Sequence, residues 1–289
     1  MEDKKEKLPS TRIQWYPVHM AKAKKEIIES LKLVDVVIEI LDARVPKSSI
    51  NPDIQEYLDN KNVIELLNKA DLADENETKK WIKYFKDKGK NAIPCNSKEG
   101  KGIKEVVKKI EEVSKSSLET AASKGRIGKT IKVMVVGIPN VGRSSFINRI
   151  SNKATAKVGN RPGVTKQKQW INVNDNIELL DTPGILWPKF ENQRVALNLA
   201  SIGTIKDENL DRFDIAYNLI KILIEHYPEN VLKRYRLEEI EDALTVIDEI
   251  ALKRGAIKRG GTIEEERVAN LILDDFRSGR LGNITLEKI

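Results

Sequence analysis

The sequence has very little cysteine and no long apolar run, and both shortages restrict what the protein can be. Cys95 is the only cysteine among 289 residues, so no disulfide can form within the chain, as suits a reducing cytosol. Apolar runs such as residues 34–41 are too short and too charged to span a bilayer. The first ten residues lack the apolar core of a signal peptide. We therefore expect a soluble, cytoplasmic protein without a membrane partner.

Positive charge is unevenly distributed along the chain. The whole chain has a net charge of +7, whereas residues 206–289 carry 14 Lys and Arg against 18 Asp and Glu, so the remainder is strongly basic. Residues 143–169 alone contain seven Lys and Arg and no acidic residue. Such a stretch is either a solvated basic face or a surface that meets a polyanion such as a nucleotide or RNA. Charge alone leaves both interpretations open.

Hydrophobic periodicity divides the chain into two domains. Up to about residue 205, short apolar runs typical of strands alternate with amphipathic helical stretches, which favours an α/β fold with a mostly parallel sheet and helices on both faces. From about residue 206 the pattern is helical only. We therefore predict an α/β domain over residues 1–205 and an all-α domain over residues 206–289. The expected strands and strand–loop segments are 34–44, 62–71, 92–100 and 131–137, followed by a pair within 169–181.

Residues 137–145, GIPNVGRSS, match the phosphate-binding P-loop pattern G-x-x-x-x-G-K-[ST], except that Arg143 replaces the lysine. Gly137 ends a predicted strand and Gly142 precedes a predicted helix, which is the context that such a loop needs. Successive backbone N–H groups and the helix N-terminus would form an anion cradle. Ser144 supplies the hydroxyl that these loops place on Mg²⁺.

A second motif, DTPG at residues 181–184, also follows a predicted strand. Asp181 at such a strand end can hold Mg²⁺ through a water molecule. The N–H group of Gly184 can meet a γ-phosphate. Both roles complement those of the P-loop.

A third motif, NKAD at residues 68–71, ends another predicted strand. The Asn68 amide and the Asp71 carboxylate match the hydrogen-bonding edge of guanine, and adenine would leave Asp71 unpaired. The aliphatic stem of Lys69 can lie over the base. Any such tetrapeptide alone also fits an ordinary turn, but three motifs that each follow a strand indicate a guanine-nucleotide site.

The order of the motifs along the chain is permuted. A Ras-like GTPase runs from the P-loop through a switch threonine to DxxG and then NKxD, whereas here NKAD precedes the P-loop and DTPG. Every strand–loop unit stays intact under this change, so the same sheet can form. Asn96, Ser97 and Lys98 then take the position of the loop behind the base. Thr165, between the P-loop and DTPG, is the expected switch threonine.

These motifs resemble, in kind and order, those of the circularly permuted GTPases, and most closely those that act in ribosome biogenesis. The similarity extends to residues 15–23, where Val18 replaces the family's glycine, to residues 36–46 and to residues 255–282, and so covers nearly the whole chain. It implies a circularly permuted Ras-like P-loop GTPase domain followed by an all-α, RNA-binding domain. It also implies hydrolysis of GTP to GDP and phosphate during assembly of the large (50S) ribosomal subunit, with the subunit precursor, 23S rRNA and ribosomal proteins as partners of a monomer.

The resemblance also assigns ligands for GTP or GDP, for Mg²⁺ and for K⁺ as an activating ion. Mg²⁺ falls to Ser144, Thr165 and Asp181. K⁺ falls to Asn140, whose alternative role is that of a loop-stabilising amide. The residues assigned to the nucleotide are Asn68, Lys69, Asp71, Asn96, Ser97, Lys98, Asn140, Val141, Gly142, Arg143, Ser144, Ser145, Thr165 and Gly184.

The sequence does not identify the group that orients the attacking water. Ras-like enzymes use a glutamine directly after DxxG, but Ile185 stands there. His19 lies in the N-terminal segment that resembles the family, and it either orients water or only packs that segment. Together with His19, the candidate catalytic residues are Arg143, Thr165 and Gly184.

Arg143 is the main departure from the pattern, because a planar guanidinium and a lysine ammonium are not interchangeable at a tight phosphate site. The arginine either reaches the phosphates and leaves a weak GTPase, or points outward and leaves a nucleotide binder, or clashes with the nucleotide. We predict a GTPase whose turnover is weak unless the ribosomal subunit stimulates it. The alternative is a nucleotide-dependent ribosome or RNA docking factor with little GTPase activity of its own.

The predicted helical domain contains a basic cluster around a run of glycines. Its members are Lys253, Arg254, Lys258 and Arg259. Such a cluster can meet RNA phosphates, or it is a solvated helix end. Since the domain is net acidic, any contact with RNA must be local.

Overall fold

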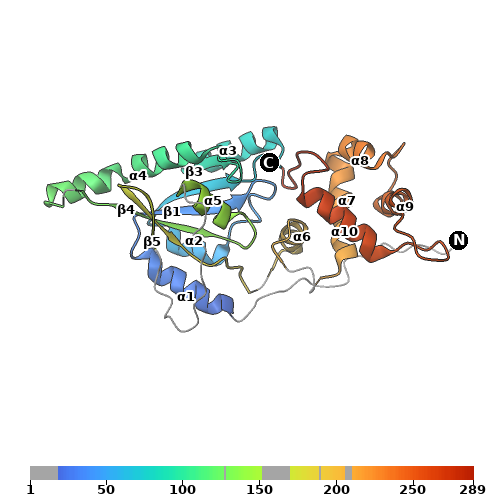
Figure 1. The fold of residues 1–289 in the computed structure, drawn as a ribbon, viewed down its shortest axis with the longest axis horizontal. Coiled ribbons are helices and arrows are strands. Elements are labelled where there is room, and N and C mark those ends of the chain that lie inside the picture. Colours follow the sequence, from blue (N-terminus) through green and yellow to red (C-terminus); the bar gives the residue numbers. More distant parts are fainter. Residues whose placement is uncertain (1–18, 127, 152–169, 189, 206–209) are drawn as a thin grey trace. The chain divides into compact units, whose positions relative to one another are not determined.

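The computed structural model describes residues 19–126, 128–151, 170–188, 190–205 and 210–289 (Figure 1). The chain divides into two compact units. The α/β unit extends to residue 187 and includes the last three residues, 287–289, whereas the helical unit comprises residues 188–286. No helix in the described parts of the chain is both long and apolar enough to cross a membrane.

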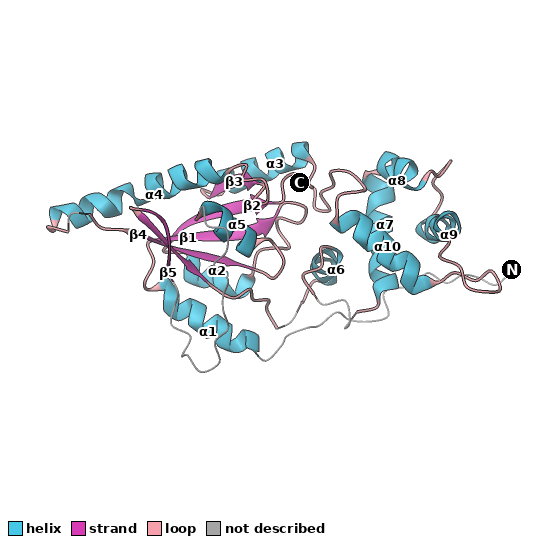
Figure 2. Ribbon diagram, viewed as in Figure 1, coloured by secondary structure: helices cyan, strands magenta, loops and turns pink. Residues whose placement is uncertain are grey.

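The α/β unit is built on a six-stranded sheet with the strand order β3-β2-β1-β4-β6-β5 (Figure 2). All neighbouring strands are parallel except β5, which pairs antiparallel with β6. The central strands are rich in Val, Ile and Leu because both faces of a parallel sheet are covered. The predicted α/β fold with a mostly parallel sheet is therefore confirmed. The strands are β1 (Val36–Asp42), β2 (Asn62–Asn68), β3 (Asn91–Cys95), β4 (Ile131–Gly137), β5 (Trp170–Asn174) and β6 (Ile177–Asp181).

Helices cover both faces of this sheet (Figure 2). Because side chains alternate between faces along a strand, Val37 and Leu41 of β1 share one face. Val37 packs with residues of α1 and α2, and Leu41 packs with residues of α3. Ile38 and Ile40 point to the other face, which α4 and α5 cover through their contacts with β1, β2 and β4. The helices are α1 (His19–Leu31), α2 (Pro52–Leu58), α3 (Glu75–Asp87), α4 (Ile103–Ser123) and α5 (Arg143–Ile150).

Four polar loops meet at the carboxyl edge of the sheet. They follow β2, β3, β4 and β6, which run parallel and so end at the same edge. NKAD stands at the end of β2, residues 96–98 follow β3, the P-loop follows β4, and DTPG stands at the end of β6. Ligand sites of parallel α/β sheets lie at this edge. The topology therefore brings together all four motifs that the sequence predicted.

The helical unit is organised around α7. This helix packs against α6, α8, α9 and α10, and its buried residues include Leu219, Ile220 and Leu223. Asp211 and Asp242 begin α7 and α9 as N-caps, because each carboxylate accepts two backbone N–H bonds from the first turn. The helices are α6 (Gln193–Ser201), α7 (Arg212–His226), α8 (Pro228–Tyr235), α9 (Ala243–Arg254) and α10 (Glu265–Arg277).

The boundary between the units differs from the one predicted at residue 205. It falls at residue 187, so α6 belongs to the helical unit. The physical reason is that α6 packs on α7 and α10. Arg277 of α10 also donates hydrogen bonds to the carbonyl oxygens of Ala200 and Ser201, at 2.8 and 2.9 Å. Periodicity alone missed this, since a short helix gives no sign of which core it joins.

The last three residues of the chain belong to the α/β unit. The Glu287 carboxylate accepts hydrogen bonds from the backbone N–H groups of Lys47 and Ser48, at 2.7 and 3.1 Å, and from the Ser48 hydroxyl. The Trp81 indole donates to the Glu287 carbonyl oxygen at 2.8 Å. Within the described residues, the polypeptide therefore passes from one unit to the other after residue 187 and again after residue 286.

Candidate nucleotide-binding site

The P-loop follows a backbone path that only glycine permits at two positions. A Cβ at Gly137 would stand 2.7 Å from the Ile40 carbonyl oxygen, and one at Gly142 would stand 2.3 Å from the Asn68 amide nitrogen. Gly142 also has a φ of 97°, which other residues rarely adopt. As the N-cap of α5 it has no side chain to satisfy the first N–H groups of that helix. The close backbone approach and the uncapped helix N-terminus fit a phosphate group.

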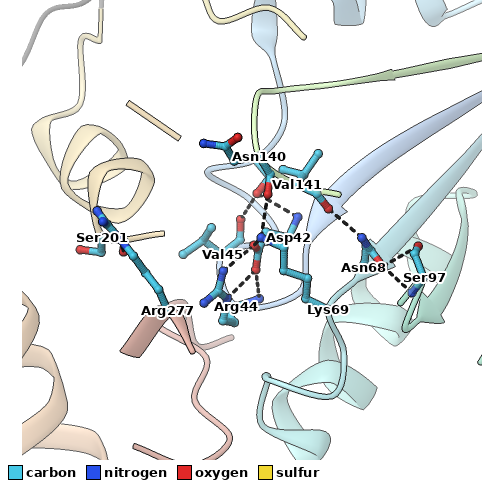
Figure 3. A network of polar contacts seen from close by, with 11 residues as sticks. Asp42, Arg44, Val45, Asn68, Lys69, Ser97, Asn140, Val141, Ser201 and Arg277 are labelled. Carbon is cyan, nitrogen blue, oxygen red and sulfur yellow. Dashed lines mark hydrogen bonds and ion pairs between the residues drawn. The ribbon is translucent and has the colours of Figure 1, made fainter. Parts of the chain in front are cut away.

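Asn68 ties the P-loop to the loop that follows β3 (Figure 3). Its Nδ2 donates to the Val141 carbonyl oxygen at 2.7 Å, and its Oδ1 accepts from the Ser97 N–H and hydroxyl at 3.0 and 2.8 Å. A side-chain amide carries two N–H hydrogens, so one remains available for a guanine acceptor. The sequence did not reveal this bracing role, because it joins residues 73 positions apart.

Lys69 holds Asn140, the P-loop residue that precedes Val141. Its ammonium donates to the Asn140 carbonyl oxygen at 2.7 Å and lies 3.0 Å from the Asp42 carboxylate (Figure 3). Lys69 and Asn140 both have left-handed backbone conformations, with φ of 59° and 64°. Such conformations are unfavourable for residues other than glycine, and the hydrogen bond holds both in place. The ammonium is thus committed to the P-loop, which leaves the aliphatic stem as the part that can face a base.

Asp42, which the sequence analysis did not assign, anchors this arrangement. Its fully buried carboxylate accepts from Arg44 Nε at 2.9 Å and from Arg44 Nη2 at 2.8 Å, besides its ion pair with Lys69. Burial by itself would raise the pKa of Asp42, but the charges and hydrogen bonds of Arg44 and Lys69 outweigh it and hold that pKa far below its usual range. The only available signal was the run D-A-R at the end of a buried strand.

The residues expected around the base divide into buried and exposed ones. Asn96 and Ser97 are buried, and the Asn96 side chain shapes its loop by accepting the Lys98 backbone N–H at 3.0 Å. The Asp71 and Lys98 side chains are exposed. An accessible carboxylate beside the Asn68 bracket is what recognition of the guanine N–H groups requires.

Arg143 points into the site, toward DTPG. Its Nη1 donates to the Thr182 carbonyl oxygen, and a Cβ at Gly184 would lie 2.8 Å from its Nη2. Burial lowers the pKa of the guanidinium, and Asp181 opposes this effect. In turn, desolvation raises the pKa of Asp181, while the charge of Arg143 opposes that rise. The structure therefore has the arginine inward, between the P-loop and DTPG.

The residues after DTPG are apolar and buried. Ile185 and Leu186 are each only 1% exposed, and the Asn51 amide donates to the Ile185 carbonyl oxygen at 3.1 Å. A buried isoleucine cannot orient water. The Leu186 N–H lies 3.4 Å from the Met20 sulfur, so the first turn of α1, which begins at His19, is adjacent to this segment. The side chain of His19 lies outside the described residues.

The expected Mg²⁺ ligands are placed in part. Ser144 and Ser145 are exposed in the first turn of α5, and Asp181 is the last residue of β6. Because β4 and β6 are parallel neighbours, both groups lie at the same edge of the sheet. Thr165 lies outside the described residues, as does most of the basic stretch 143–169.

A mostly parallel sheet that carries a P-loop, DTPG and NKAD at one edge defines the class of P-loop GTPases. Because NKAD and its strand precede the P-loop strand along the chain, the GTPase is circularly permuted.

Comparisons with known proteins identify its branch. Residues 132–255 match the 50S ribosome-binding GTPase family. The chain is 48% identical over 276 residues to ribosome biogenesis GTPase A of Bacillus cereus, which covers 95% of this chain and 93% of the relative. Two solved structures of YlqF also match. The GDP-bound one has a TM-score of 0.66 and 28% identity over 91% of this chain and 98% of the matched chain. The GNP-bound one, from Thermotoga maritima, has a TM-score of 0.65 and 29% identity over 92% of this chain and 98% of the matched chain. The chain belongs to the ribosome biogenesis GTPase A family.

This membership confirms the main functional prediction. The protein is a GTP-binding GTPase that acts in ribosome biogenesis. It uses guanine nucleotides, typically with Mg²⁺, and its partners are ribosomal.

Proposed function

We propose that this GTPase acts in assembly of the large (50S) ribosomal subunit, as a cytoplasmic monomer that contacts 23S rRNA and ribosomal proteins of the subunit precursor. The description of the matching family as 50S ribosome-binding supports this proposal. The basic charge of the chain outside residues 206–289 also favours a polyanionic partner.

The observation that carries the nucleotide site is the bracing of the P-loop by NKAD. Asn68 and Lys69 bind two successive carbonyl oxygens of that loop, so the cradle is held in shape before a ligand arrives. A preorganised site loses less ordering free energy on binding. The guanine base would bind to Asn68, Lys69, Asp71 and residues 96–98. The phosphates would bind to residues 140–145 and Gly184.

The metal ions would bind at the phosphate end of the site. Ser144, Asp181 and Thr165 would hold Mg²⁺, which would neutralise negative charge that develops during phosphoryl transfer. The exposed side chain of Asn140 would hold an activating K⁺ beside them.

Water is the remaining participant, and His19 is the residue proposed to orient it. The contact between Met20 and the Leu186 N–H supports this assignment, because it keeps the start of α1 beside the segment that follows DTPG. A buried Ile185 leaves the usual position of a water-orienting side chain unavailable.

Arg143 determines the rate of GTP hydrolysis that we expect. Its guanidinium is bonded to the Thr182 carbonyl oxygen, so it must exchange this partner for phosphate oxygens when a nucleotide enters. We therefore expect weak hydrolysis by the isolated chain and stimulation by the subunit. The alternative is a nucleotide-dependent docking factor with little turnover.

Phosphate release, measured with and without large subunits and in KCl and NaCl, separates the two. Faster release with subunits, and in KCl over NaCl, supports the proposed GTPase. GTP-dependent binding to subunits without phosphate release in either salt supports the docking factor. Calorimetry that detects neither GTP nor GDP binding would contradict both.

A further inference from the structure

A cavity of 870 Å³ lies within the helical unit, among the ends of α8 and α9 and the segment that follows α10. We call it the α8–α10 pocket. Its lining contains six cationic side chains and no acidic one, although residues 206–289 are net acidic with 14 Lys and Arg in all. The cationic residues are Lys233, Arg234, Arg236, Lys253, Arg254 and Arg280.

One buried carboxylate orients two of these cations. Asp275, which is 2% exposed, accepts from Arg234 Nε and Nη2 at 2.8 Å each and from Arg280 Nε at 2.6 Å. Burial alone would raise the pKa of Asp275, but the two arginines hold it below its usual range. Asp275 therefore stays ionised and fixes both guanidinium groups. Its single negative charge leaves a large positive excess around the pocket.

The other four cations have no carboxylate partner within the described residues. Lys253 donates to the carbonyl oxygen of Arg236, the C-cap of α8, and Arg254 donates to the carbonyl oxygen of Arg234 in the last turn of that helix. These bonds satisfy helix-end acceptors without neutralising charge. The side chains of Lys233 and Arg236 are exposed.

The wall of the pocket also contains a buried tyrosine that interacts with Asp275. Tyr235 is 1% exposed, and the Asp275 carboxylate acts on its hydroxyl. Burial, and then the charge of Asp275, raise the pKa of Tyr235, so the hydroxyl remains a donor. The Arg254 guanidinium lies over the Tyr235 ring, 5.8 Å from its centroid. This stacking keeps the Arg254 side chain at the wall of the pocket.

We propose that the α8–α10 pocket binds phosphate groups of an RNA strand. Guanidinium forks match phosphate oxygens bidentately, whereas an apolar ligand would desolvate the cations without compensation. The proposal rests on the proposed function, because the large subunit supplies the RNA. It also divides the basic cluster found in the sequence, since Lys258 and Arg259 do not line the pocket.

This division supplies a matched pair of variants. Lys233→Gln with Arg280→Gln removes two exposed cations from the pocket, and Lys258→Gln with Arg259→Gln removes two exposed cations elsewhere in the same unit. Circular dichroism verifies that both full-length variants are folded. Filter binding then measures the affinity of each for labelled 23S rRNA over a range of KCl concentrations.

We expect the pocket variant to lose roughly tenfold in affinity per phosphate contact at about 0.1 M KCl. The slope of log affinity against log KCl concentration should fall in magnitude by about one per contact. The control variant should keep the affinity and the slope of the unsubstituted chain. Equal losses in both variants, or no loss in the pocket variant, would overturn the assignment of the pocket.

Two further measurements distinguish a failure of the pocket assignment from a failure of the proposed function. If the unsubstituted chain fails to sediment with purified 50S subunits, the proposed function fails, whatever the pocket does. If it sediments and the pocket variant binds RNA equally well, only the pocket assignment fails. Calorimetry with pyrophosphate tests the other source of phosphate: tight binding that the pocket variant loses, with RNA binding unchanged, would assign the pocket to a small phosphorylated ligand.

Discussion

Arg143 is the residue whose chemistry departs most from a standard phosphate loop. Its inward guanidinium occupies the space between the P-loop and DTPG, where it binds the Thr182 carbonyl oxygen. Gly184 tolerates this only because it has no Cβ, which would stand 2.8 Å from Arg143 Nη2. The guanidinium is thus bonded to the Thr182 carbonyl oxygen at the position where a P-loop lysine would bind phosphate.

Arg143→Lys should therefore raise GTP affinity, or the rate of hydrolysis, by roughly tenfold. A hydrogen bond from a charged donor contributes about 1.5 kcal/mol, and tenfold corresponds to about 1.4 kcal/mol; a lysine lacks the fork that makes this bond and the close approach to Gly184. Calorimetry with GDP and a GTP analogue, together with phosphate release, measures the effect. Equal affinity and equal turnover in the two proteins would contradict this account.

Asn68 and Asp71 belong to one motif but should behave differently. Asn68 is buried and bonded to Val141 and Ser97, so Asn68→Ala should lower the free energy of unfolding by about 2 kcal/mol even without nucleotide, in addition to weakening GDP binding. Asp71 is exposed, so Asp71→Ala should weaken GDP binding and leave stability unchanged. Urea unfolding without nucleotide and calorimetry with GDP measure both quantities. An unchanged unfolding free energy in Asn68→Ala would show that the bracing contacts do not matter.

At the scale of the elements, β1 and β2 place two buried glutamates side by side. Glu39 and Glu65 are opposite each other in the parallel register. The Gln55 amide of α2 lies 2.9 and 3.0 Å from the two Glu39 carboxylate oxygens, and Lys90 forms a 2.9 Å ion pair with Glu65. Burial raises the pKa of Glu39 to about 7, against the hydrogen bond from Gln55. Burial also raises the pKa of Glu65.

This arrangement predicts that stability falls as the pH rises toward neutrality. A carboxyl whose pKa is higher in the folded chain contributes stability that is complete below the unfolded pKa of 4.5 and is lost as pH passes through about 7. For Glu39 the loss is roughly 3 kcal/mol at most. Glu39→Gln should flatten this dependence between about pH 4.5 and 7, as measured by urea unfolding, with the exposed Glu56→Gln as control. The same slope in Glu39→Gln as in the unsubstituted chain would contradict the assignment.

At the scale of the whole molecule, DTPG is close in sequence to the boundary of the two units. Gly184, the proposed γ-phosphate contact, precedes that boundary by three residues. The chain crosses it again after residue 286, where Glu287 binds the loop at Lys47 and Ser48. An order–disorder change of DTPG on binding GTP can therefore act directly on a connection to the helical unit.

We expect small-angle scattering to give different radii of gyration for the GDP-bound and GTP-analogue-bound protein. Gly184→Ala is the control, because its Cβ would meet Arg143 and lie 3.1 Å from the Pro139 nitrogen, so it should retain GDP binding and lose the difference. Identical scattering of the unsubstituted protein in the two states would exclude this coupling.

The fold and the edge at which the nucleotide site lies could be predicted well from the sequence. Alternating strands and helices predicted the parallel sheet, and motifs at strand ends had to meet because parallel strands end at one edge. The boundary at residue 205 was wrong because it depends on whether α6 packs with one core or the other. The roles of Asp42 and Arg44 were missed because burial and pairing of charged groups are not visible in a local pattern.

By itself, the sequence determined the class of protein and the permuted order of its motifs, and it supplied the residues proposed to bind a guanine nucleotide, since these follow from spacing along strands and loops. Only the tertiary structure decided how those residues act. In the folded chain, Asn68 and Lys69 hold the P-loop through hydrogen bonds, and Arg143 bonds to the Thr182 carbonyl oxygen. Six cationic side chains of the net acidic helical unit line one pocket. The physical reason is the same in each case: hydrogen bonds and charge pairs between distant segments form only when packing brings them within about 3 Å.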